Sequence, residues 1–209
     1  SRGLLFISSL LMAIYSYTQV GLIVTHALMA VFPLLTVLLS GVFLKEEITQ
    51  IKIIAVGVGF IGVIIIINPV NLQFSLVSFL PLISAVTFAI YAVLTRKVAL
   101  TDNTETSFFW VSLVSAIAIT IPSPLFYNPI QFSDIYFLVL LCMFSLLGHF
   151  LLTNAYRYTE ASVLQPFSYF HLFFASIVGI IFFKDPLTIS TVAGGLLIVF
   201  GGILISKKS

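Results

Sequence analysis

The sequence predicts an all-α, polytopic membrane protein, on the evidence of its composition and of the spacing of its apolar segments. Of its 209 residues, 60% are hydrophobic and 8% are charged, and the mean hydropathy is +1.22. Soluble domains carry roughly 25% charged residues. Seven acidic and nine basic side chains are too few to cover a soluble fold of this size. The composition therefore excludes a soluble globular enzyme, and the net charge of +2 is too small to indicate a nucleic-acid partner.

Apolar segments follow one another at the spacing of membrane spans. A helix that crosses about 30 Å of hydrocarbon needs about 20 apolar residues, so about eight spans fit in the chain. The predicted spans are 3–18, 25–44, 53–67, 77–94, 108–121, 135–155, 161–183 and 187–206. A membrane β-barrel would show strands of about ten residues with alternating polarity, whereas residues 61–67 are continuously apolar. We therefore expect about eight transmembrane helices in a lipid bilayer.

Three of these segments contain a proline. Pro33, Pro81 and Pro166 each lack a backbone N–H and loosen a helix, which membrane proteins tolerate where neighbours or cavity water satisfy the freed carbonyl. Such kinks serve either as hinges for a rocking motion or as plain packing irregularities, and the sequence leaves both interpretations open.

Basic residues are distributed unevenly between the two ends of the predicted spans. With Ser1 placed inside, the inner side receives eight Lys and Arg residues and the outer side receives only Lys184. The inner residues are Arg2, Lys45, Lys52, Arg96, Lys97, Arg157, Lys207 and Lys208. Because cytoplasmic loops collect Lys and Arg, we expect an inner-membrane protein with both ends of the chain in the cytoplasm.

Two short motifs recur in the second half of the chain. Residues 15–19, Tyr-Ser-Tyr-Thr-Gln, return as Tyr-Arg-Tyr-Thr-Glu at 156–160, and the Leu-Lys-Glu-Glu-Ile-Thr of 44–49 returns as Phe-Lys-Asp-Pro-Leu-Thr at 183–188. The offsets are 141 and 139 residues, and Gly62 falls opposite Gly201 at the second offset. The first Lys-acid turn is predicted inside and the second outside, so the copies are inverted across the membrane. In many transporters the substrate site lies between such inverted repeats.

The motifs resemble the EamA domains of the drug/metabolite transporter superfamily. The most specific parts are residues 27–46, with Pro33 in the span and Phe-Leu-Lys-Glu at its end, and residues 148–163. The resemblance implies two inverted five-span repeats, of which residues 1–71 would be the last three spans of the first and residues 72–209 the second. Since the chain opens on Ser1 and enters an apolar segment at once, we expect a fragment covering family spans three to ten. Asp185 stands where the family commonly has Glu.

Motifs of cofactor and metal sites find no support. Residues 57–62 match the G-x-G-x-x-G dinucleotide fingerprint. They lie inside a predicted span, without the strand and acidic residue that the fingerprint needs, so we expect glycines that permit close helix contact. The three His residues are too far apart for a local metal site, and Cys142 has no second cysteine to pair with. We therefore expect no cofactor, no metal and no enzyme activity.

Uncharged polar residues are the candidates for a substrate cavity, because the seven acidic residues all fall in loops or at helix ends. At helical spacing these polar residues form stripes on single faces. The predicted cavity residues are Tyr15 and Gln19 of the first span, Thr87 and Tyr91 of the fourth, His149, Thr153 and Tyr156 of the sixth, and Gln165 and Tyr169 of the seventh. The alternative is that these side chains hydrogen-bond across helix interfaces. His26 and His171 are weaker candidates.

The family resemblance implies a carrier that moves a small organic solute across the inner membrane by alternating access. A cavity of Tyr, His, Gln and Thr suits an amino acid, a nucleoside-like solute or a similar polar aromatic metabolite. Composition alone predicts only a polytopic helical membrane protein, so a non-transporting membrane scaffold and, third, a lipid-modifying enzyme stay as alternatives. The expected partners are the small-molecule substrate and the lipid bilayer, and the sequence leaves a homodimer open.

Overall fold

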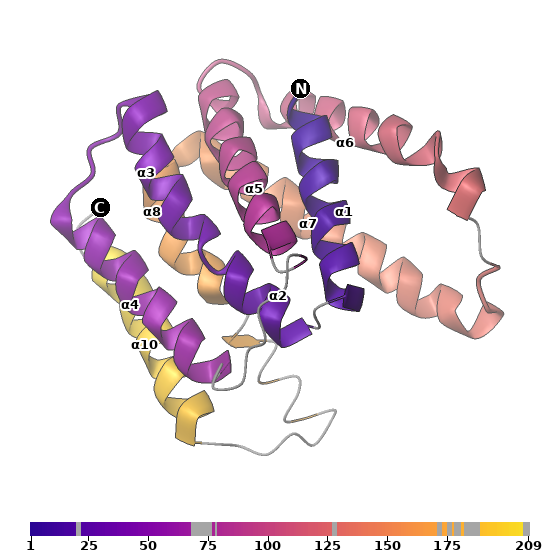
Figure 1. Ribbon diagram of the computed structural model, residues 1–209. Helices are drawn as coiled ribbons and strands as arrows, with labels where there is room; N and C mark the ends of the chain where they lie inside the picture. The colour runs from indigo at the N-terminus through magenta and orange to yellow at the C-terminus, as the bar shows by residue number, and fades with distance from the viewer. Residues whose placement is uncertain are drawn as a thin grey trace.

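Helices make up the secondary structure of the part of the chain that the structure describes. The computed structural model describes residues 1–19, 22–67, 77, 79–126, 129–170, 173–174, 177, 181 and 189–206. Its helices are α1 (Arg2–Gln19), α2 (Leu22–Met29), α3 (Phe32–Leu44), α4 (Gln50–Ile67), α5 (Phe79–Ala99), α6 (Thr104–Thr120), α7 (Ile135–Tyr158), α8 (Ala161–Leu164) and α10 (Ile189–Ser206), with the 3₁₀ turns η2 (Ser123–Phe126), η3 (Phe132–Asp134) and η4 (Gln165–Tyr169) (Figure 1). No strand occurs among the described residues, and the all-α prediction is confirmed.

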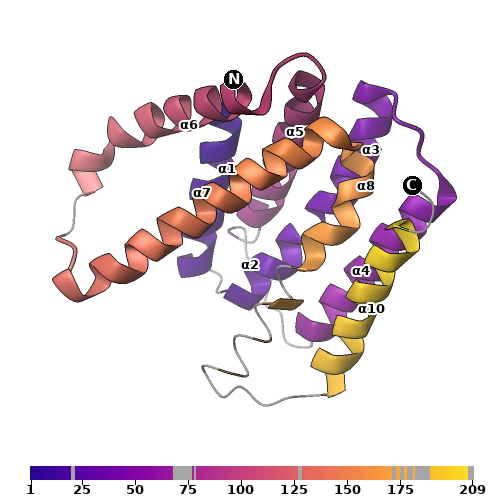
Figure 2. The same ribbon diagram turned by 180° about the vertical axis from the view of Figure 1, so that it is seen from behind.

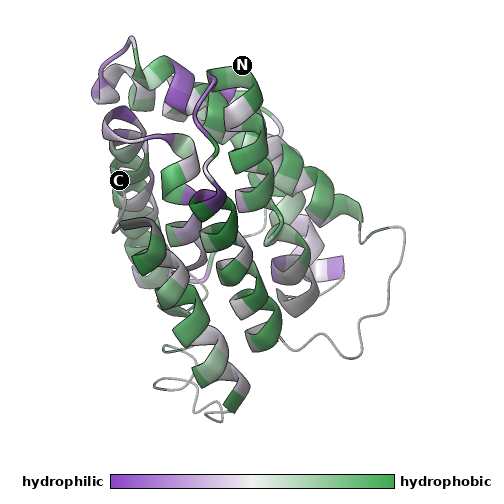
Figure 3. Cartoon of the chain, turned by 90° about the vertical axis from the view of Figure 1, so that its left-hand side faces the viewer, coloured by the Kyte–Doolittle hydropathy of each residue, from purple (hydrophilic) through white to green (hydrophobic). Residues whose placement is uncertain are grey.

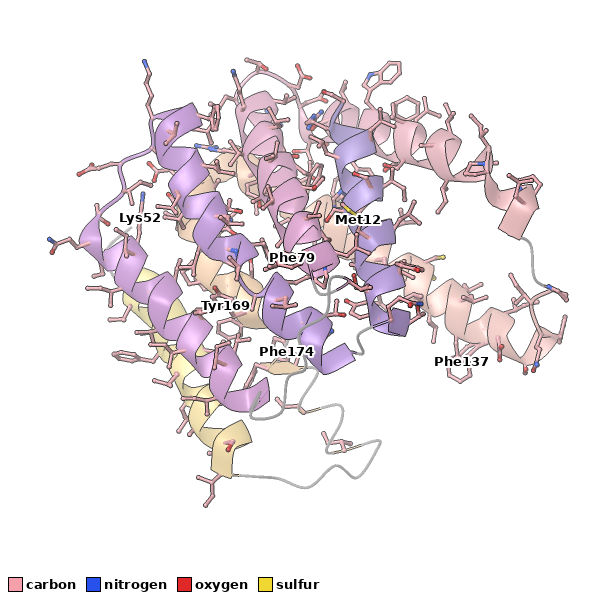
Figure 4. The ribbon with its side chains drawn as sticks, in the orientation of Figure 1. Met12, Lys52, Phe79, Phe137, Tyr169 and Phe174 are labelled. Atoms are coloured by element: carbon pink, nitrogen blue, oxygen red, sulfur yellow. The ribbon has the colours of Figure 1, made fainter. Side chains whose placement is uncertain are left out.

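Several helices are long and apolar enough to cross a membrane. The stretches Phe79–Ala99, Thr104–Leu125 and Phe132–Tyr158 meet both criteria, and Phe32–Leu44, Gln50–Ile65 and Val192–Gly201 are shorter apolar helices. Hydrophobic residues run along the lengths of the helices (Figure 3). Phe137 of α7, for example, is 68% exposed and points away from the other helices (Figure 4). An apolar surface of this extent fits lipid as the surrounding medium.

Pro33 and Pro166 break helices, as predicted, whereas Pro81 does not. The second predicted span is divided, since α2 ends at Met29 and α3 begins at Phe32 with Pro33 in its first turn. In the seventh span, Pro166 lies at the start of η4, directly after α8. Pro81 lies in the first turn of α5, where a missing N–H costs no hydrogen bond, and the helix continues through it. The two breaks fall in spans that correspond in the two repeats.

The described basic residues gather at one end of the helix bundle. They are Arg2 at the start of α1, Lys45 after α3, Lys52 in the first turn of α4, Arg96 and Lys97 at the end of α5, and Arg157 at the end of α7. These helix ends lie towards the top of Figure 1, and Figure 2 shows α7 rising to join α8 there. We call this the basic end and the opposite one the far end. Which side of the membrane the basic end faces stays a prediction.

Some features of the sequence lie outside the described residues. They are the predicted boundary between residues 71 and 72, His171, Lys184, Asp185, Lys207 and Lys208. The outer turn of the second repeat, with its Lys-acid pair, therefore stays a prediction from the recurring motif.

Helices α4 and α10 pack backbone to backbone through glycines. A Cβ placed on Gly62 would lie 2.6 Å from the carbonyl oxygen of Gly194, and a Cβ placed on Gly201 would lie 2.8 Å from the carbonyl oxygen of Ala55. Residues 62 and 201 are 139 positions apart, as are residues 55 and 194. The two contacts are therefore related by the same offset as the predicted inverted repeats, which supports that prediction. At Gly62 the prediction of close helix packing is confirmed.

Helices α1 and α5 are joined by a pair of serines. The hydroxyl of Ser9 donates to the carbonyl oxygen of Ser84 at 2.9 Å, and the hydroxyl of Ser84 donates to the carbonyl oxygen of Ser9 at 2.8 Å. Both side chains are buried. Lipid offers no hydrogen bonds, so polar groups at a helix interface pair with each other. This reciprocal pair ties a helix of the first predicted repeat to a helix of the second.

Candidate functional site

A cavity of about 210 Å³ lies beside the break between α2 and α3. Its lining residues are Tyr17 of α1, His26 and Met29 of α2, Ala30 and Phe32 at the break, Val63 of α4, and Tyr169 of η4. Both predicted repeats contribute to this lining, and none of its described residues is an Asp, Glu, Lys or Arg. Transporters place their substrate sites at repeat interfaces where helices are broken. This cavity is therefore the candidate substrate site.

Tyr169 connects the cavity to the helix break. Its side chain is 1% exposed and lies between α4 and the α2–α3 pair (Figure 4). The hydroxyl of Tyr169 donates to the carbonyl oxygen of Ala30, in the turn between the two helices, at 3.1 Å. On its other side the ring packs on the backbone of α4, because a Cβ placed on Gly59 would lie 2.5 Å from it. Gly59 thus supplies the room that the ring occupies.

Tyr17 and His26 form an aromatic wall of the cavity. Their ring centroids are 5.4 Å apart, and the two ring planes are tilted by 40°. Met29 and Phe32 add apolar surface to the same cavity. Aromatic faces stack on flat organic groups, and an imidazole adds a directional hydrogen bond. The lining is therefore able to recognise a flat solute by stacking and by a small number of polar contacts.

The predicted residues Tyr91 and His149 lie together in a closed aromatic cluster. The Tyr91 hydroxyl oxygen and His149 Nε2 are 2.8 Å apart, and Tyr91 is 1% exposed. Phe6 of α1 stacks on the His149 ring with the centroids 4.4 Å apart, and the Phe108 ring of α6 lies 5.8 Å away. The cluster joins α1, α5, α6 and α7. Neither Tyr91 nor His149 lines the 210 Å³ cavity.

Four other predicted cavity residues are engaged in local contacts. Thr87 and Thr153 donate to backbone carbonyls one turn earlier in their own helices, at 2.8 and 2.9 Å. Gln165 is fully buried and donates to the backbone carbonyl four residues earlier at 2.8 Å. Tyr156 is 3% exposed and packs in a cluster of small apolar residues from α5 and α8. None of the four lines the 210 Å³ cavity, and their role at a substrate site stays a prediction.

Tyr15 and Gln19 lie on the surface of α1, apart from the other predicted residues. Tyr15 is 55% exposed, and the side-chain amide of Gln19 donates to Thr18 Oγ1 at 3.4 Å. The second tyrosine of the recurring motif, Tyr17, lines the cavity instead. The recurring motif of residues 15–19 was the sequence signal for Tyr17, but it contains both Tyr15 and Tyr17 and does not distinguish between them. Met29 and Phe32 carried no polar signal and could not have been selected by a search for polar stripes.

At the basic end, Glu46 holds the beginning of α8. Its carboxylate accepts hydrogen bonds from the backbone N–H groups of Ala161 and Ser162 at 2.9 and 3.0 Å, and from the Ser162 hydroxyl at 2.8 Å. The first N–H groups of a helix have no partner within the helix, so a carboxylate there satisfies them. Lys45, with a φ of 57°, turns the chain at the end of α3 and precedes Glu46. This contact ties the end of α3 to the start of α8.

Arg96 and Lys52 extend the contacts of Glu46 to other helices. The guanidinium of Arg96 lies 3.6 Å from the Glu46 carboxylate and donates to the carbonyl oxygens of Tyr156 and Arg157 at 2.7 and 3.2 Å. The ammonium of Lys52 forms an ion pair with Glu160. We call Glu46, Lys52, Arg96 and Glu160 the Glu46 network. It joins α3, α4, α5, α7 and α8 at the basic end, and the sequence predicted only that Lys45 and Glu46 mark a helix end.

Comparison with known proteins identifies relatives that are named as transporters. The chain is 28% identical over 201 residues to the riboflavin transporter of Brucella anthropi, covering 93% of this chain and 71% of that protein. It is 25% identical over 199 residues to the S-adenosylmethionine uptake transporter of Rickettsia felis, covering 95% and 67%. It is 26% identical over 208 residues to the pseudopaline exporter CntI of Pseudomonas aeruginosa, covering 99% and 73%.

The fold and the family agree with these relatives. A solved crystal structure matches the chain with a TM-score of 0.79 at 14% sequence identity, over 98% of this chain and 75% of that one. A likeness at this identity shows the fold. Residues 75–207, more than half of the chain, match the EamA-like transporter family. The resemblance predicted from the recurring motifs is confirmed: the chain belongs to the EamA-like transporter family of membrane proteins.

Proposed function

We propose that the protein is a secondary carrier or exchanger that moves a small organic solute across the inner membrane by alternating access. The observation that carries this proposal is the cavity at the α2–α3 break, because its lining comes from both predicted repeats. Tyr169 of η4 and Tyr17 of α1 face the same space from helices of different repeats. A solute bound between the two repeats changes sides of the membrane when one repeat rocks against the other.

The chemistry of the lining favours a solute with a flat, largely uncharged ring. A cavity of about 210 Å³ holds a metabolite rather than a drug-sized molecule, since drug-sized ligands occupy roughly 300–1,000 Å³. Tyr17, His26 and Tyr169 offer aromatic faces and a few polar atoms, and among the described lining residues there is no Asp, Glu, Lys or Arg to pair with an ionic group. An aromatic amino acid or a nucleoside-like solute fits this description. Relatives named for riboflavin and S-adenosylmethionine support a solute that carries a ring system.

The Glu46 network fits the role of a closure at the basic end. Its contacts join the ends of α3, α4, α5 and α8 at the basic end. The cavity lies between the far-end parts of α1, α2 and α4. An alternating-access carrier closes one end while the other is open. We infer that the solute reaches the cavity from the far end while the Glu46 network is intact, and leaves when the network opens.

The proposal is tested by solute uptake into proteoliposomes that contain the full-length protein. Radiolabelled tryptophan and adenosine are the two probes, and at least one should accumulate saturably above protein-free liposomes. Tyr169→Leu should raise the half-saturation concentration about tenfold, because it removes an aromatic face of the lining, and aromatic pairs contribute about 0.5–1.5 kcal/mol beyond the area they bury. Tyr15→Leu, at an exposed tyrosine of α1, is the matched control and should leave it unchanged. Equal uptake by folded protein and empty liposomes for both probes would favour a membrane scaffold.

A further inference from the structure

A second hollow of the molecule lies between α3 and α5 and is lined almost entirely by apolar side chains. Its volume is about 340 Å³. The lining residues are Leu35, Leu39 and Phe43 of α3 with Val86, Ile90, Val93, Leu94 and Lys97 of α5. Among these described lining residues, Lys97 is the single charged one. The groove shares no residue with the cavity at the α2–α3 break, so it needs an explanation of its own.

The length of the groove matches one leaflet of a bilayer. Val86 and Lys97 mark its extent along α5, and at about 1.5 Å per residue the eleven steps between them span about 16 Å. This is about half of the roughly 30 Å hydrocarbon core. The two helices run in the same direction, since Phe43 and Lys97 both lie near helix ends at the basic end. The groove therefore runs from about the middle of the membrane to its surface at the basic end.

The surface end of the groove carries a positive charge that no described residue pairs with. Arg96, the neighbour of Lys97, is bound to Glu46 and to two backbone carbonyls of α7. Lys97 is exposed, and within the described ranges it makes no hydrogen bond or ion pair. Basic pockets between transmembrane helices bind the anionic headgroups of phospholipids.

We propose that the groove binds one anionic phospholipid of the leaflet at the basic end, with an acyl chain between α3 and α5 and the headgroup phosphate on Lys97. The apolar walls recognise the chain and exclude water, and the ammonium recognises the charge. The lipid touches α3 directly before the turn that directs Glu46 to α8. Occupancy of the groove therefore stabilises the position of α3 against α5.

The test is native mass spectrometry of the purified full-length protein with phosphatidylglycerol and phosphatidylcholine that carry identical acyl chains. The wild type should bind phosphatidylglycerol at least fivefold more tightly than phosphatidylcholine. Lys97→Gln should remove this preference and retain the weaker binding common to both lipids. Arg157→Gln removes a basic residue of the same end that does not line the groove, and it should keep the preference.

A second pair of variants tests the acyl chain separately from the charge. Ile90→Trp fills the groove and should weaken the binding of both lipids by at least fivefold, whereas Ile83→Trp, at an exposed position of the same helix outside the groove, should not. Equal affinity of the wild type for the two lipids would overturn the proposal. So would equal effects of Ile90→Trp and Ile83→Trp, or a dimer of the wild type that blocks lipid binding. None of these outcomes depends on whether the protein carries a solute.

Discussion

The two ends of the bundle are held by different kinds of contact. At the basic end, Glu46 and Arg96 bind backbone groups and each other across four helices, and both ion pairs of the described residues lie there. Around the cavity, the rings of Tyr17 and His26 pack against each other, and the hydroxyl of Tyr169 donates to a backbone carbonyl. Polar contacts near the membrane surface can be exchanged for contacts with water, whereas aromatic contacts fix the shape of a cavity. We therefore propose that the basic end opens and closes during transport while the cavity recognises the solute.

The largest expected effect comes from removing the carboxylate that organises the basic end. Glu46→Ala takes three hydrogen bonds from the start of α8 and leaves the partly buried Arg96 without its partner. Loss of one member of such a pair should lower the free energy of unfolding by about 3 kcal/mol. Denaturant titration of the protein in detergent measures this value.

Glu47 provides the matched control for this experiment. It is the next residue, it is exposed, and within the described chain its carboxylate makes no hydrogen bond. Glu47→Ala should therefore change the free energy of unfolding by less than about 0.5 kcal/mol. Equal losses in Glu46→Ala and Glu47→Ala would contradict the role given to the Glu46 network.

An intermediate effect is expected from a methyl group added beside the cavity. Gly59→Ala places a Cβ 2.5 Å from the Tyr169 ring, which has to move. Overpacking of this kind should cost about 1–3 kcal/mol of unfolding free energy and weaken solute binding. Gly57→Ala lies in the same helix where a Cβ meets open space, and it should be neutral or stabilising by about 0.5–1 kcal/mol.

A double variant shows whether the cost of Gly59→Ala comes from the tyrosine ring. In a Tyr169→Leu background the added methyl group meets a smaller side chain, so most of the penalty should disappear. A penalty that is unchanged in this background would mean that the ring and the glycine are not in the contact described.

The smallest expected effect distinguishes the aromatic cluster from the cavity. Tyr91→Phe removes the hydrogen bond to His149 and keeps the ring. The free energy of unfolding should fall by about 1 kcal/mol, while the half-saturation concentration for the solute should stay unchanged. A tenfold loss of solute affinity without loss of stability would instead return Tyr91 and His149 to the substrate site, where the polar stripes first placed them.

Hydropathy and repeats predicted the fold because they depend on residues close in sequence or related by a constant offset. The span lengths, the break at Pro33 and the glycine contact of Gly62 all follow from such signals. Local sequence signals did not predict which neighbour the polar stripe of each helix would face. The phase of α1 is set by what it packs against, and Ser9 on the α5 face leaves Tyr15 exposed while Tyr17 lines the cavity.

The contact of Glu46 with α8 was beyond sequence reasoning for a different reason. Its partners are backbone N–H groups 115 and 116 residues away, and a backbone amide has no residue type that could signal it. Tyr169 was predicted from its place on a polar stripe, and it lines the 210 Å³ cavity, while its role in binding a substrate stays a prediction. The hydrogen bond from Tyr169 to Ala30 could not be predicted, because its acceptor is again a backbone group, at a helix break.

The glycine contact between α4 and α10 has a consequence for how movements of this protein are measured. At Gly62 and Gly201 each helix contacts the backbone of the other, which leaves little room for the helices to shift past each other, so we expect the pair to move as one rigid body. Spectroscopic labels on these two helices should report one distance with and without solute. The distance from a label on α3 or on α7 to a label on the α4–α10 pair should take several values. The α4–α10 pair can therefore serve as the fixed reference against which movements of the other helices are measured.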